Sequence, residues 1–407
     1  MRGSLFLQAA MIVTLTLMTQ RAESQVAVQL VSPRDHIAGS MLGHQALYAD
    51  QDRIYLASFQ GKLFVLARDR SGDFPLLQIV QDTTFPLTAV RGDHKNLYVT
   101  SMDGTLRVYR KTRPLSLSAT IPLSDYGLSS LALTNEKIYV AQGQAQLAVD
   151  EDFVYLAALN EGDTALEITK GTWQPGLTYG QSFEPHMAVV FDRQSGERVF
   201  GIPAPVNAFG QPDLGVLYVD TQILGQTTPG CCGSGIFVSD AQTFQLHQVI
   251  PRFYTNTIVR RGQWLIAGNE GGQIDVFDLE QNPAPLVSSA HLRYLTGHTG
   301  GEDIEIRSLW TDRLDNLIFA ASSWGNQQSR TPSLPSFFVL ALMTDQLGDL
   351  DVDGDVDRDD VTLLRVALKT PASGPDDPRD LDGDGKITSR DMQQLKSLCT
   401  RPKCAAG

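Results

Sequence analysis

The chain has 407 residues, with 46 Asp and Glu against 33 Lys and Arg, and a formal net charge of −13. Binding to a phosphate backbone requires clustered Lys and Arg, so this charge argues against a general nucleic-acid-binding protein. At roughly 100–200 residues per domain, the length predicts two domains, or one large domain with a small one. The 35 glycines and 20 prolines interrupt the chain often, which favours short strands over long helices.

A cationic start and a short apolar run open the chain. Arg2 precedes the run Leu5–Met18, and the small residues Ala22 and Ser24 follow it at the spacing of a cleavage site. We interpret residues 1–24 as a secretory signal peptide. The alternative, a membrane anchor, is disfavoured because a bilayer span needs about 20 apolar residues. The mature protein is therefore expected in the extracellular space or the periplasm, without a membrane span.

Four cysteines fall into two distant pairs, Cys231 with Cys232 and Cys399 with Cys404. In an oxidising compartment, the simplest pairing is two local disulfides, one of them between adjacent residues. A zinc site is the weaker interpretation, because no histidine lies near either pair at zinc-finger spacing. The adjacent pair would either staple its loop or line a ligand site.

A strand pattern recurs through the middle of the chain. A short alternating strand is followed by a polar turn, a second strand and a third strand, and the second strands begin at Ile54, Leu97 and Ile138. Repeats of about 40–50 residues that contain only strands are typical of a β-propeller with one four-stranded blade per repeat. Gly61 and Gly104 precede third strands, which predicts tight hairpin turns at these two positions.

Six copies of the pattern can be counted, so we predict a mainly β fold, a six-bladed propeller over residues 25–345, with seven blades as the alternative. The stretch Val26–Val31 is predicted to be the outer strand of the last blade, where it would close the ring and cover an open edge. The segment Val189–Glu197 resembles the outer strands of secreted quinoprotein-like and six-bladed propellers. That resemblance concerns a fold and not one activity.

Long segments separate the second and third strands in three of the copies, and we interpret them as insertions on one rim of the disc. The insertions are residues 142–185, 222–234 and 322–336. Loops held by a rigid scaffold are where binding groups concentrate. Their aromatic residues Trp173, Tyr179 and Trp324 are predicted to bind a ligand such as a glycan, the alternative being that they pack the loops against the disc.

Acidic residues near these insertions are candidates for acid–base chemistry. A pair of carboxyl groups about 5–10 Å apart can hydrolyse a glycosidic bond, whereas solvated surface charge is the alternative interpretation. The candidates are Glu161, Asp163, Glu167, Glu184, His186, His298, Glu302, Asp303 and Glu305. No catalytic residue is assigned, because the sequence has no serine nucleophile elbow and no phosphate-binding loop.

Two matched acidic loops follow Gly348. Each has aspartates at positions 1, 3, 5 and 12, glycine at position 6 and an aliphatic residue at position 8. Calcium requires about six to eight oxygen ligands, and this alternation aims successive carboxylates at one ion while position 7 offers its backbone carbonyl. We predict two calcium ions, with ligands from Asp349, Asp351, Asp353, Asp355 and Asp360 and from Asp380, Asp382, Asp384, Lys386 and Asp391.

With the helices expected at residues 361–368 and 392–398, this segment resembles a dockerin type I module. The resemblance implies a small α-helical, EF-hand-like calcium module, here residues 346–407, that docks one helix face on a cohesin domain. It also implies partner contacts at loop positions 10 and 11, which are occupied by Arg358, Asp359, Ser389 and Arg390.

Two functions are consistent with these features. In the first, a non-catalytic secreted protein binds a glycan or protein ligand through its propeller and docks to another protein through the calcium module. In the second, the propeller is a carbohydrate-active enzyme, a glycoside hydrolase or polysaccharide lyase, that the same module tethers for polysaccharide breakdown. An enzyme should bring paired carboxylates to the inserted rim, whereas a binding protein should bring aromatic rings.

Overall fold

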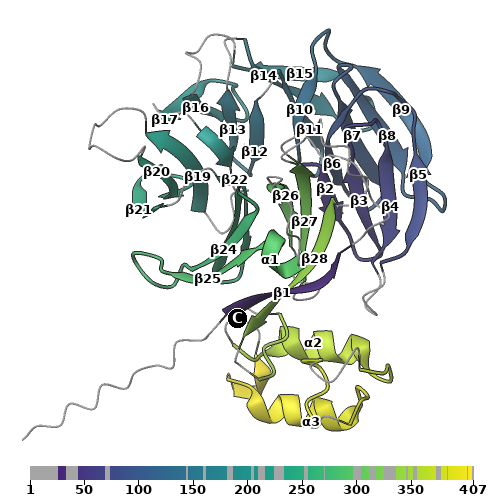
Figure 1. Cartoon of the computed structure of the whole chain (residues 1–407). Coiled ribbons are helices and arrows are strands. Elements are labelled where there is room, and N and C mark those ends of the chain that lie inside the picture. Colours follow the sequence, from purple (N-terminus) through teal and green to yellow (C-terminus); the bar gives the residue numbers. More distant parts are fainter. Residues whose placement is uncertain are drawn as a thin grey trace, which may run out of the picture.

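A computed structural model of the chain shows a disc of β-sheets with two helices side by side beneath it (Figure 1). The structure describes residues 26–33, 45–68, 74–143, 145–158, 162–180, 187–202, 206–209, 216–223, 233–251, 255–269, 271–296, 304–311, 317–324, 336–344, 347–351, 355–372, 377–382, 384–400 and 402–405. The predicted signal peptide, residues 1–24, lies outside them.

The described strands form seven four-stranded antiparallel sheets. The first two sheets are β2 (Leu47–Ala49), β3 (Arg53–Ala57), β4 (Leu63–Ala67) and β5 (Leu76–Val80), then β6 (Leu87–Gly92), β7 (Asn96–Ser101), β8 (Thr105–Arg110) and β9 (Ser116–Pro122). The next two are β10 (Leu128–Leu133), β11 (Lys137–Gln142), β14 (Thr164–Thr169) and β15 (Pro175–Tyr179), then β12 (Gln146–Val149), β13 (Phe153–Ala158), β16 (Met187–Asp192) and β17 (Arg198–Ile202).

Three further sheets complete the disc. They are β18 (Val206–Phe209), β19 (Val216–Ile223), β20 (Gly233–Asp240) and β21 (Leu246–Pro251), then β22 (Thr255–Arg261), β23 (Trp264–Asn269), β24 (Gln273–Asp278) and β25 (Leu286–His291), and finally β26 (Ile304–Trp310), β27 (Leu317–Trp324), β28 (Phe337–Thr344) and β1 (Val26–Pro33). A short helix, α1 (Leu292–Thr296), follows β25.

The sheets form a closed ring. The inner strands β2, β6, β10, β12, β18, β22 and β26 each contact the next, and β26 contacts β2. This arrangement confirms the predicted β-propeller. The described sheets number seven, which is the alternative count and not the preferred six.

The ring closes as predicted through the N-terminal strand. Strand β1 pairs antiparallel with β28, with Val26 opposite Thr344 and Leu30 opposite Leu340. Covering the outer edge of this sheet removes a row of unpaired main-chain groups. The predicted tight turns are also present, because Gly61 and Gly104 have φ of 76° and 75°. A Cβ at Gly104 would lie 1.9 Å from the Ser124 carbonyl oxygen, so only glycine fits this turn.

Two neighbouring blades are interleaved, and this corrects the predicted insertion over residues 142–185. The chain builds β10 and β11 in one sheet, crosses to the next sheet for β12 and β13, returns for β14 and β15, and crosses again for β16 and β17. Strand β11 therefore pairs with β14, and β13 with β16. Most of the supposed rim loop is blade structure, which explains why counting consecutive copies missed a blade.

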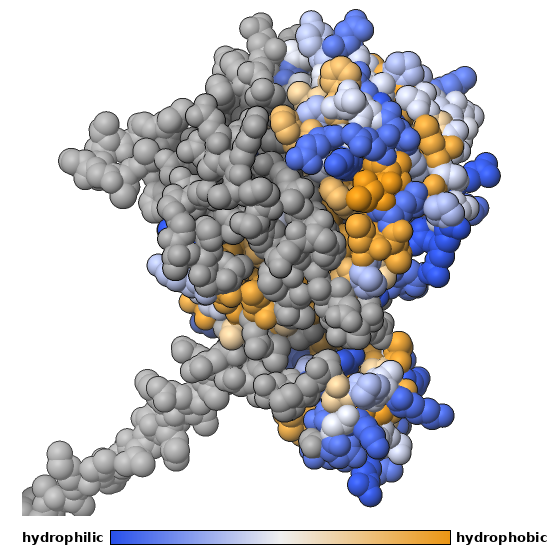
Figure 2. Space-filling model, turned by 45° about the vertical axis from the view of Figure 1, so that its right-hand side comes forward, coloured by the Kyte–Doolittle hydropathy of each residue, from blue (hydrophilic) through white to orange (hydrophobic). Residues whose placement is uncertain are grey.

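Burial follows the position of each strand in its blade. Inner strands and their neighbours are almost wholly buried, as in β3 and β23, whereas the outer strands β5 and β9 alternate between exposed and partly buried residues. Sheets covered on both faces produce continuous apolar runs, and sheets with one solvated face produce alternation. On the described part of the propeller surface, hydrophobic patches lie among hydrophilic side chains (Figure 2).

An aspartate–tyrosine pair braces the first hairpin of several blades. The aspartate Oδ1 accepts hydrogen bonds from main-chain N–H groups two and three residues later, and its Oδ2 accepts one from a tyrosine hydroxyl five residues later. The pairs are Asp50 with Tyr55, Asp93 with Tyr98, and Asp150 with Tyr155. In each pair, one aspartate therefore provides hydrogen-bond acceptors for the N–H groups of the turn and for the hydroxyl of a buried tyrosine.

A small module follows β28. Helices α2 (Arg358–Ala367) and α3 (Ser389–Leu398) pack together, and a 3₁₀ turn, η1 (Pro402–Cys404), ends the described chain. Each helix begins about three residues before its predicted start, because a capping box precedes it: Asp357 with Asp360, and Thr388 with Asp391. Leu364 and Leu395 are fully buried in the core between the helices.

The propeller and the module also meet through Arg261, the last residue of β22. Its Nε donates a 2.7 Å hydrogen bond to the main-chain oxygen of Asp351, and its Nη1 donates to Thr311 Oγ1 at 3.2 Å. Arg261 is 4% exposed and Asp351 is 6% exposed. The two bodies therefore share a buried polar contact in addition to the chain that links them.

Replacing Tyr98 by phenylalanine should lower the free energy of unfolding by about 1 kcal/mol, because it removes the 2.8 Å hydrogen bond to Asp93. Burial raises the pKa of Asp93, but hydrogen bonds from the N–H groups of Asn96 and Lys95 and from Tyr98 outweigh it and lower the pKa to about 2. The stabilisation by the carboxylate is therefore present above the unfolded-state pKa of about 4 and is lost as pH falls toward 2.

Denaturant unfolding between pH 7 and pH 2 measures this effect, and the difference between wild type and Tyr98→Phe should shrink toward the acid end. Tyr126→Phe is the matched control, because Tyr126 is 76% exposed. Equal destabilisation by the two variants at pH 7 would contradict a stabilising role for the hydrogen bond between Tyr98 and Asp93.

Replacing Arg261 by glutamine should loosen the contact between propeller and module. The Asp351 carbonyl would lose a charged donor within a buried setting, which costs about 1–3 kcal/mol. Hydrogen exchange at residues 347–351 should become faster. Arg260→Gln is the control, because Arg260 Nε donates to Gly262 O within its own hairpin. Equal exchange in both variants would show that Arg261 does not hold the module.

Candidate functional site

The first acidic loop brings three carboxylates together beside the propeller. Ligand oxygens of Asp349, Asp351 and Asp360 lie within 4.8 Å of one another, and all three residues are buried. Gly348 precedes them with φ of 93°, and a Cβ there would lie 2.9 Å from Leu395. The chain can therefore enter the loop in this conformation only with glycine at this position.

Asp360 holds the first loop closed. Its Oδ1 accepts hydrogen bonds from the N–H groups of Leu350 at 2.6 Å and Asp351 at 3.2 Å, and its Oδ2 accepts one from Asp357 N–H at 2.7 Å. The last acidic position of the loop is thus also the third residue of α2. Helix and loop are therefore one unit, because the same carboxylate caps one and closes the other.

The second loop repeats this arrangement in a more exposed setting. Oxygens of Asp380, Asp382 and Asp384 lie within 4.8 Å of one another, with Asp380 half-buried and the other two exposed. Asp391 Oδ1 accepts from Asp382 N–H at 3.2 Å, and Oδ2 accepts from Thr388 N–H at 2.6 Å. Burial raises the pKa of Asp391, but hydrogen bonds from Thr388, Asp382 and Leu381 outweigh it and lower the pKa.

The two halves of the module exchange main-chain hydrogen bonds. Val356 O accepts from Thr400 N–H at 2.9 Å, and Ile387 O accepts from Lys369 N–H at 2.7 Å. Each partner follows the helix of the other half. The position-8 residues Val356 and Ile387 are both buried in the common core. Each loop is therefore held by the opposite half, so the module forms as a pair of repeats.

The carboxylate clusters fit calcium. Calcium–oxygen distances are about 2.3–2.6 Å, so two ligands on opposite sides of one ion lie about 4.6–5.2 Å apart. The ligand atoms of each cluster lie within 4.8 Å of one another, which is close enough for one ion to contact all three. Three carboxylates held this close repel one another, and in the first loop burial strengthens the repulsion, so a bound cation would stabilise the cluster. Oxygen-only donor sets suit hard cations such as calcium.

Other predicted ligands are placed as follows. Asp355 and Lys386 stand at position 7 of their loops, and Lys386 N–H donates to Asp384 Oδ1 at 2.9 Å. Asp353 lies outside the described residues. The structure thus gathers Asp349, Asp351 and Asp360 in one cluster and three of the second-loop aspartates in the other.

The predicted partner-contacting residues occupy equivalent exposed positions. Arg358 and Asp359 lie in the first turn of α2, and Ser389 and Arg390 lie in the first turn of α3. All four are exposed, because the capping boxes turn the adjacent carboxylates inward. Basic residues follow on the same exposed surfaces, Arg365 on α2 and Lys396 on α3.

A disulfide closes the chain end beside α3. Cys399 and Cys404 are bonded, as predicted, with their Cα atoms 5.3 Å apart, and both pack partly against the core of the module. This bond fixes η1 against the last helix and indicates an oxidising compartment. The predicted pair Cys231 and Cys232 lies outside the described residues.

The aromatic residues predicted to bind a ligand are placed differently from one another. Tyr179, in β15, is fully buried, and its hydroxyl donates to Glu167 at 3.2 Å and to Arg193 O at 3.0 Å. The described structure thus makes Tyr179 a packing residue, which corrects its prediction as an open ligand platform. Trp173 is partly buried with its ring edge-on to Tyr98, the centroids 6.5 Å apart. Trp324 ends β27, and its side chain is outside the described part.

The candidate acid–base residues do not form a catalytic pair in the described part of the chain. Glu167 is buried and accepts hydrogen bonds from Lys137 at 2.7 Å and Tyr179, so it has a structural role. Asp163 is also buried. Glu305 pairs with Arg307. The remaining candidates lie outside the described residues: Glu161, Glu184, His186, His298, Glu302 and Asp303.

Comparisons with solved structures show the propeller fold. The computationally designed Ika8 protein aligns with this chain at a TM-score of 0.51 and 14% sequence identity. The alignment covers 77% of this chain and 99% of the Ika8 chain. The WD40 domain of Neurospora crassa Pan2 has a TM-score of 0.52 and 10% identity, covering 78% of this chain and 94% of its own. At these identities the similarity concerns the fold alone.

The curated proteins contain no match to this chain. None of the helices in the described part has the length and apolar character that crossing a membrane requires. Residues 347–398 match the model of the dockerin type I domain. That segment includes both acidic clusters and both capped helices described above. The chain therefore carries a C-terminal dockerin type I module after a β-propeller.

Proposed function

We propose that this protein is a secreted docking protein, in which a module that binds two calcium ions attaches a ligand-binding propeller to a cohesin-like partner. The main support is the pair of capped helices whose first turns expose equivalent residues directly beside the acidic clusters. Docking and calcium are coupled in this proposal because Asp360 and Asp391 belong to both the loops and the helices.

Calcium would order the docking surface in a simple way. The two carboxylate clusters would each hold one ion, which would neutralise the cluster and tie the beginning of the loop to the first turn of its helix. The exposed residues Arg358 and Asp359, and Ser389 and Arg390, then stand at fixed positions on the two helices. A protein partner with acidic side chains would complement the basic residues of these surfaces.

The proposed location is outside the cytoplasm. The sequence pattern of residues 1–24 supports export, and the Cys399–Cys404 disulfide supports an oxidising compartment. For the propeller, we propose a glycan or protein ligand and a non-catalytic role, because Glu167, a described candidate for acid–base chemistry, is engaged with Lys137 and Tyr179.

Removing calcium should unfold residues 348–398 while the propeller stays folded. Differential scanning calorimetry of the full chain, with calcium and with chelator, would show a transition for the module that moves to lower temperature or disappears. Asp360→Asn should produce the same shift at saturating calcium, because it removes a ligand and weakens the loop clamp. Asp359→Asn is the matched control, since its side chain is exposed. A module transition that is indifferent to chelator would contradict calcium binding.

Docking should depend on calcium and on the exposed helix turns. In a binding assay against a panel of cohesin domains, the combined variant Arg358→Glu and Arg390→Glu should weaken binding at least about tenfold, because it reverses charge at both surfaces. Arg113→Ala is the control, since this residue is 75% exposed on the propeller. Circular dichroism at saturating calcium confirms that the variants fold. Unchanged cohesin binding by the combined variant would contradict the proposal that Arg358 and Arg390 contact the partner.

A further inference from the structure

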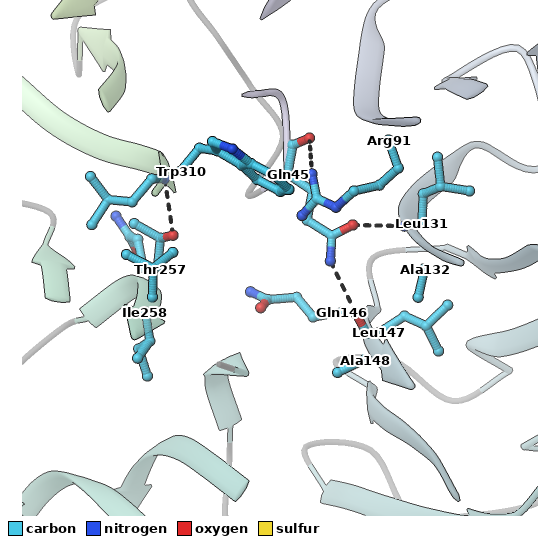
Figure 3. Close-up of a pocket in the computed structure, with 13 residues that line it drawn as sticks. Gln45, Arg91, Leu131, Ala132, Gln146, Leu147, Ala148, Thr257, Ile258 and Trp310 are labelled. Carbon is cyan, nitrogen blue, oxygen red and sulfur yellow. Dashed lines mark hydrogen bonds between the residues drawn. The ribbon is translucent and has the colours of Figure 1, made fainter. Parts of the chain in front are cut away.

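A pocket lies at the centre of the propeller, where the inner strands meet (Figure 3). Its cavity volume is about 70 Å³. At about 10–15 Å³ for each water molecule this is room for roughly five to seven waters, and so for a small ligand and not a drug-sized one. Polar and apolar atoms share the wall about equally, and the apolar part comes from residues such as Leu131, Leu147, Ile258, Leu309 and Trp310. Strands from several blades contribute, so a ligand here would contact the assembled ring and not one blade.

Among the described residues that line the pocket, Arg91 in the inner strand β6 is the one that carries a charge. Its Nη1 donates to three main-chain oxygens, those of Val90 at 2.8 Å, Leu47 at 3.1 Å and Gln45 at 3.3 Å. Its Nε and Nη2 donate to no atom in the described part of the chain, and no carboxylate there pairs with it. In a protein of net charge −13, the described residues thus provide no counter-ion for this cation.

The guanidinium remains charged in this setting. Burial lowers the pKa of Arg91 to about 10, which is still well above neutral pH. The group lies over the Trp310 ring, 5.4 Å from its centroid, and the cation–π contact helps to replace lost hydration. The buried Trp310 Nε1–H also has no hydrogen-bond partner in the described structure. The Arg91 N–H groups are therefore the donors that this pocket offers to an acceptor from outside, whereas the Trp310 Nε1–H is enclosed.

Gln45 holds Arg91 in a fixed position. Its side chain accepts from Leu131 N–H at 2.8 Å and donates to Leu147 O at 3.0 Å, while its main-chain oxygen accepts from Val90 N–H and from Arg91. Figure 3 shows Gln45 between Arg91 and the strands that carry Leu131 and Leu147. One residue thus links three inner strands, and a site that is rigid before binding loses less entropy when the ligand enters.

We propose that this central pocket binds a small organic carboxylate, held by Nε and Nη2 of Arg91, with its apolar body against the aliphatic wall. The two free N–H groups form one edge of a planar fork that matches the two oxygens of a carboxylate. The proposal specifies the ligand-binding role proposed for the propeller, and it is independent of docking through the calcium module.

Isothermal titration calorimetry of the full chain with calcium tests the site, with sodium benzoate as probe at constant ionic strength and pH 7. Benzoate should bind, and Arg91→Gln should weaken binding at least about tenfold, because it removes a charge-assisted hydrogen-bond pair. Arg110→Gln, at an exposed arginine of β8, should leave the affinity unchanged.

Ala132→Leu is the second variant, because it fills the pocket from β10 while Arg91 is retained, and it keeps the test decisive if Arg91→Gln does not fold. It should also abolish benzoate binding. Absence of benzoate binding to the wild type, or unchanged binding in Ala132→Leu, overturns the proposal. If sulfate binds as tightly as benzoate, the site is not specific for an organic carboxylate and the proposal is wrong. If glucuronate binds more tightly than benzoate, the ligand is a sugar acid and not a carboxylate with an apolar body. Cohesin binding measured on the same protein separates failure of this site from failure of docking.

Discussion

Closure of the ring is the constraint on which the rest of the structure depends. A single four-stranded sheet cannot bury both of its faces, so each blade requires a neighbour on either side. Pairing of β1 with β28 supplies the last contact by joining the two ends of the propeller in one sheet. The module follows β28 directly, so the same pairing fixes the position at which the module leaves the propeller. At this position Arg261 of the propeller reaches the first acidic loop. The inner strands brought together by closure also create the pocket around Arg91.

Features with a local sequence signal could be predicted, and the interleaved blades could not. Glycine at a turn with positive φ, a closing strand and a carboxylate loop are each specified by nearby residues, as at Gly104 and Asp349. The exchange of hairpins between two blades depends on pairings such as β11 with β14, which skip a hairpin and leave no trace in the spacing of copies. One signal was present: Asp150 and Tyr155 repeat the brace of Asp93 and Tyr98, and they mark the first hairpin of the missed blade.

Residue type alone also could not separate a binding aromatic from a packing one. Tyr179 and Trp173 were grouped by their apparent place in a loop, but Tyr179 lies in a blade strand where its ring is enclosed and its hydroxyl is satisfied by Glu167. The sequence does not single out Arg91, for the opposite reason. Nothing in its neighbouring residues distinguishes it, and its free N–H groups emerge only when Gln45, distant by 46 residues, is placed against it. Long-range placement, and not composition, decides which of these groups can meet a ligand.

The module shows how one repeated motif acquires two different environments. Both halves have the same capping boxes and the same acidic spacing, and each is held by the other. The first cluster is buried and its Asp351 carbonyl is hydrogen-bonded to Arg261 of the propeller, whereas Asp382 and Asp384 of the second are exposed. Like charges repel more strongly where water is excluded, so the first loop gains more from a bound cation. An ion there would stabilise the joint between the two bodies as well as the loop, while an ion in the second loop would act on the module alone.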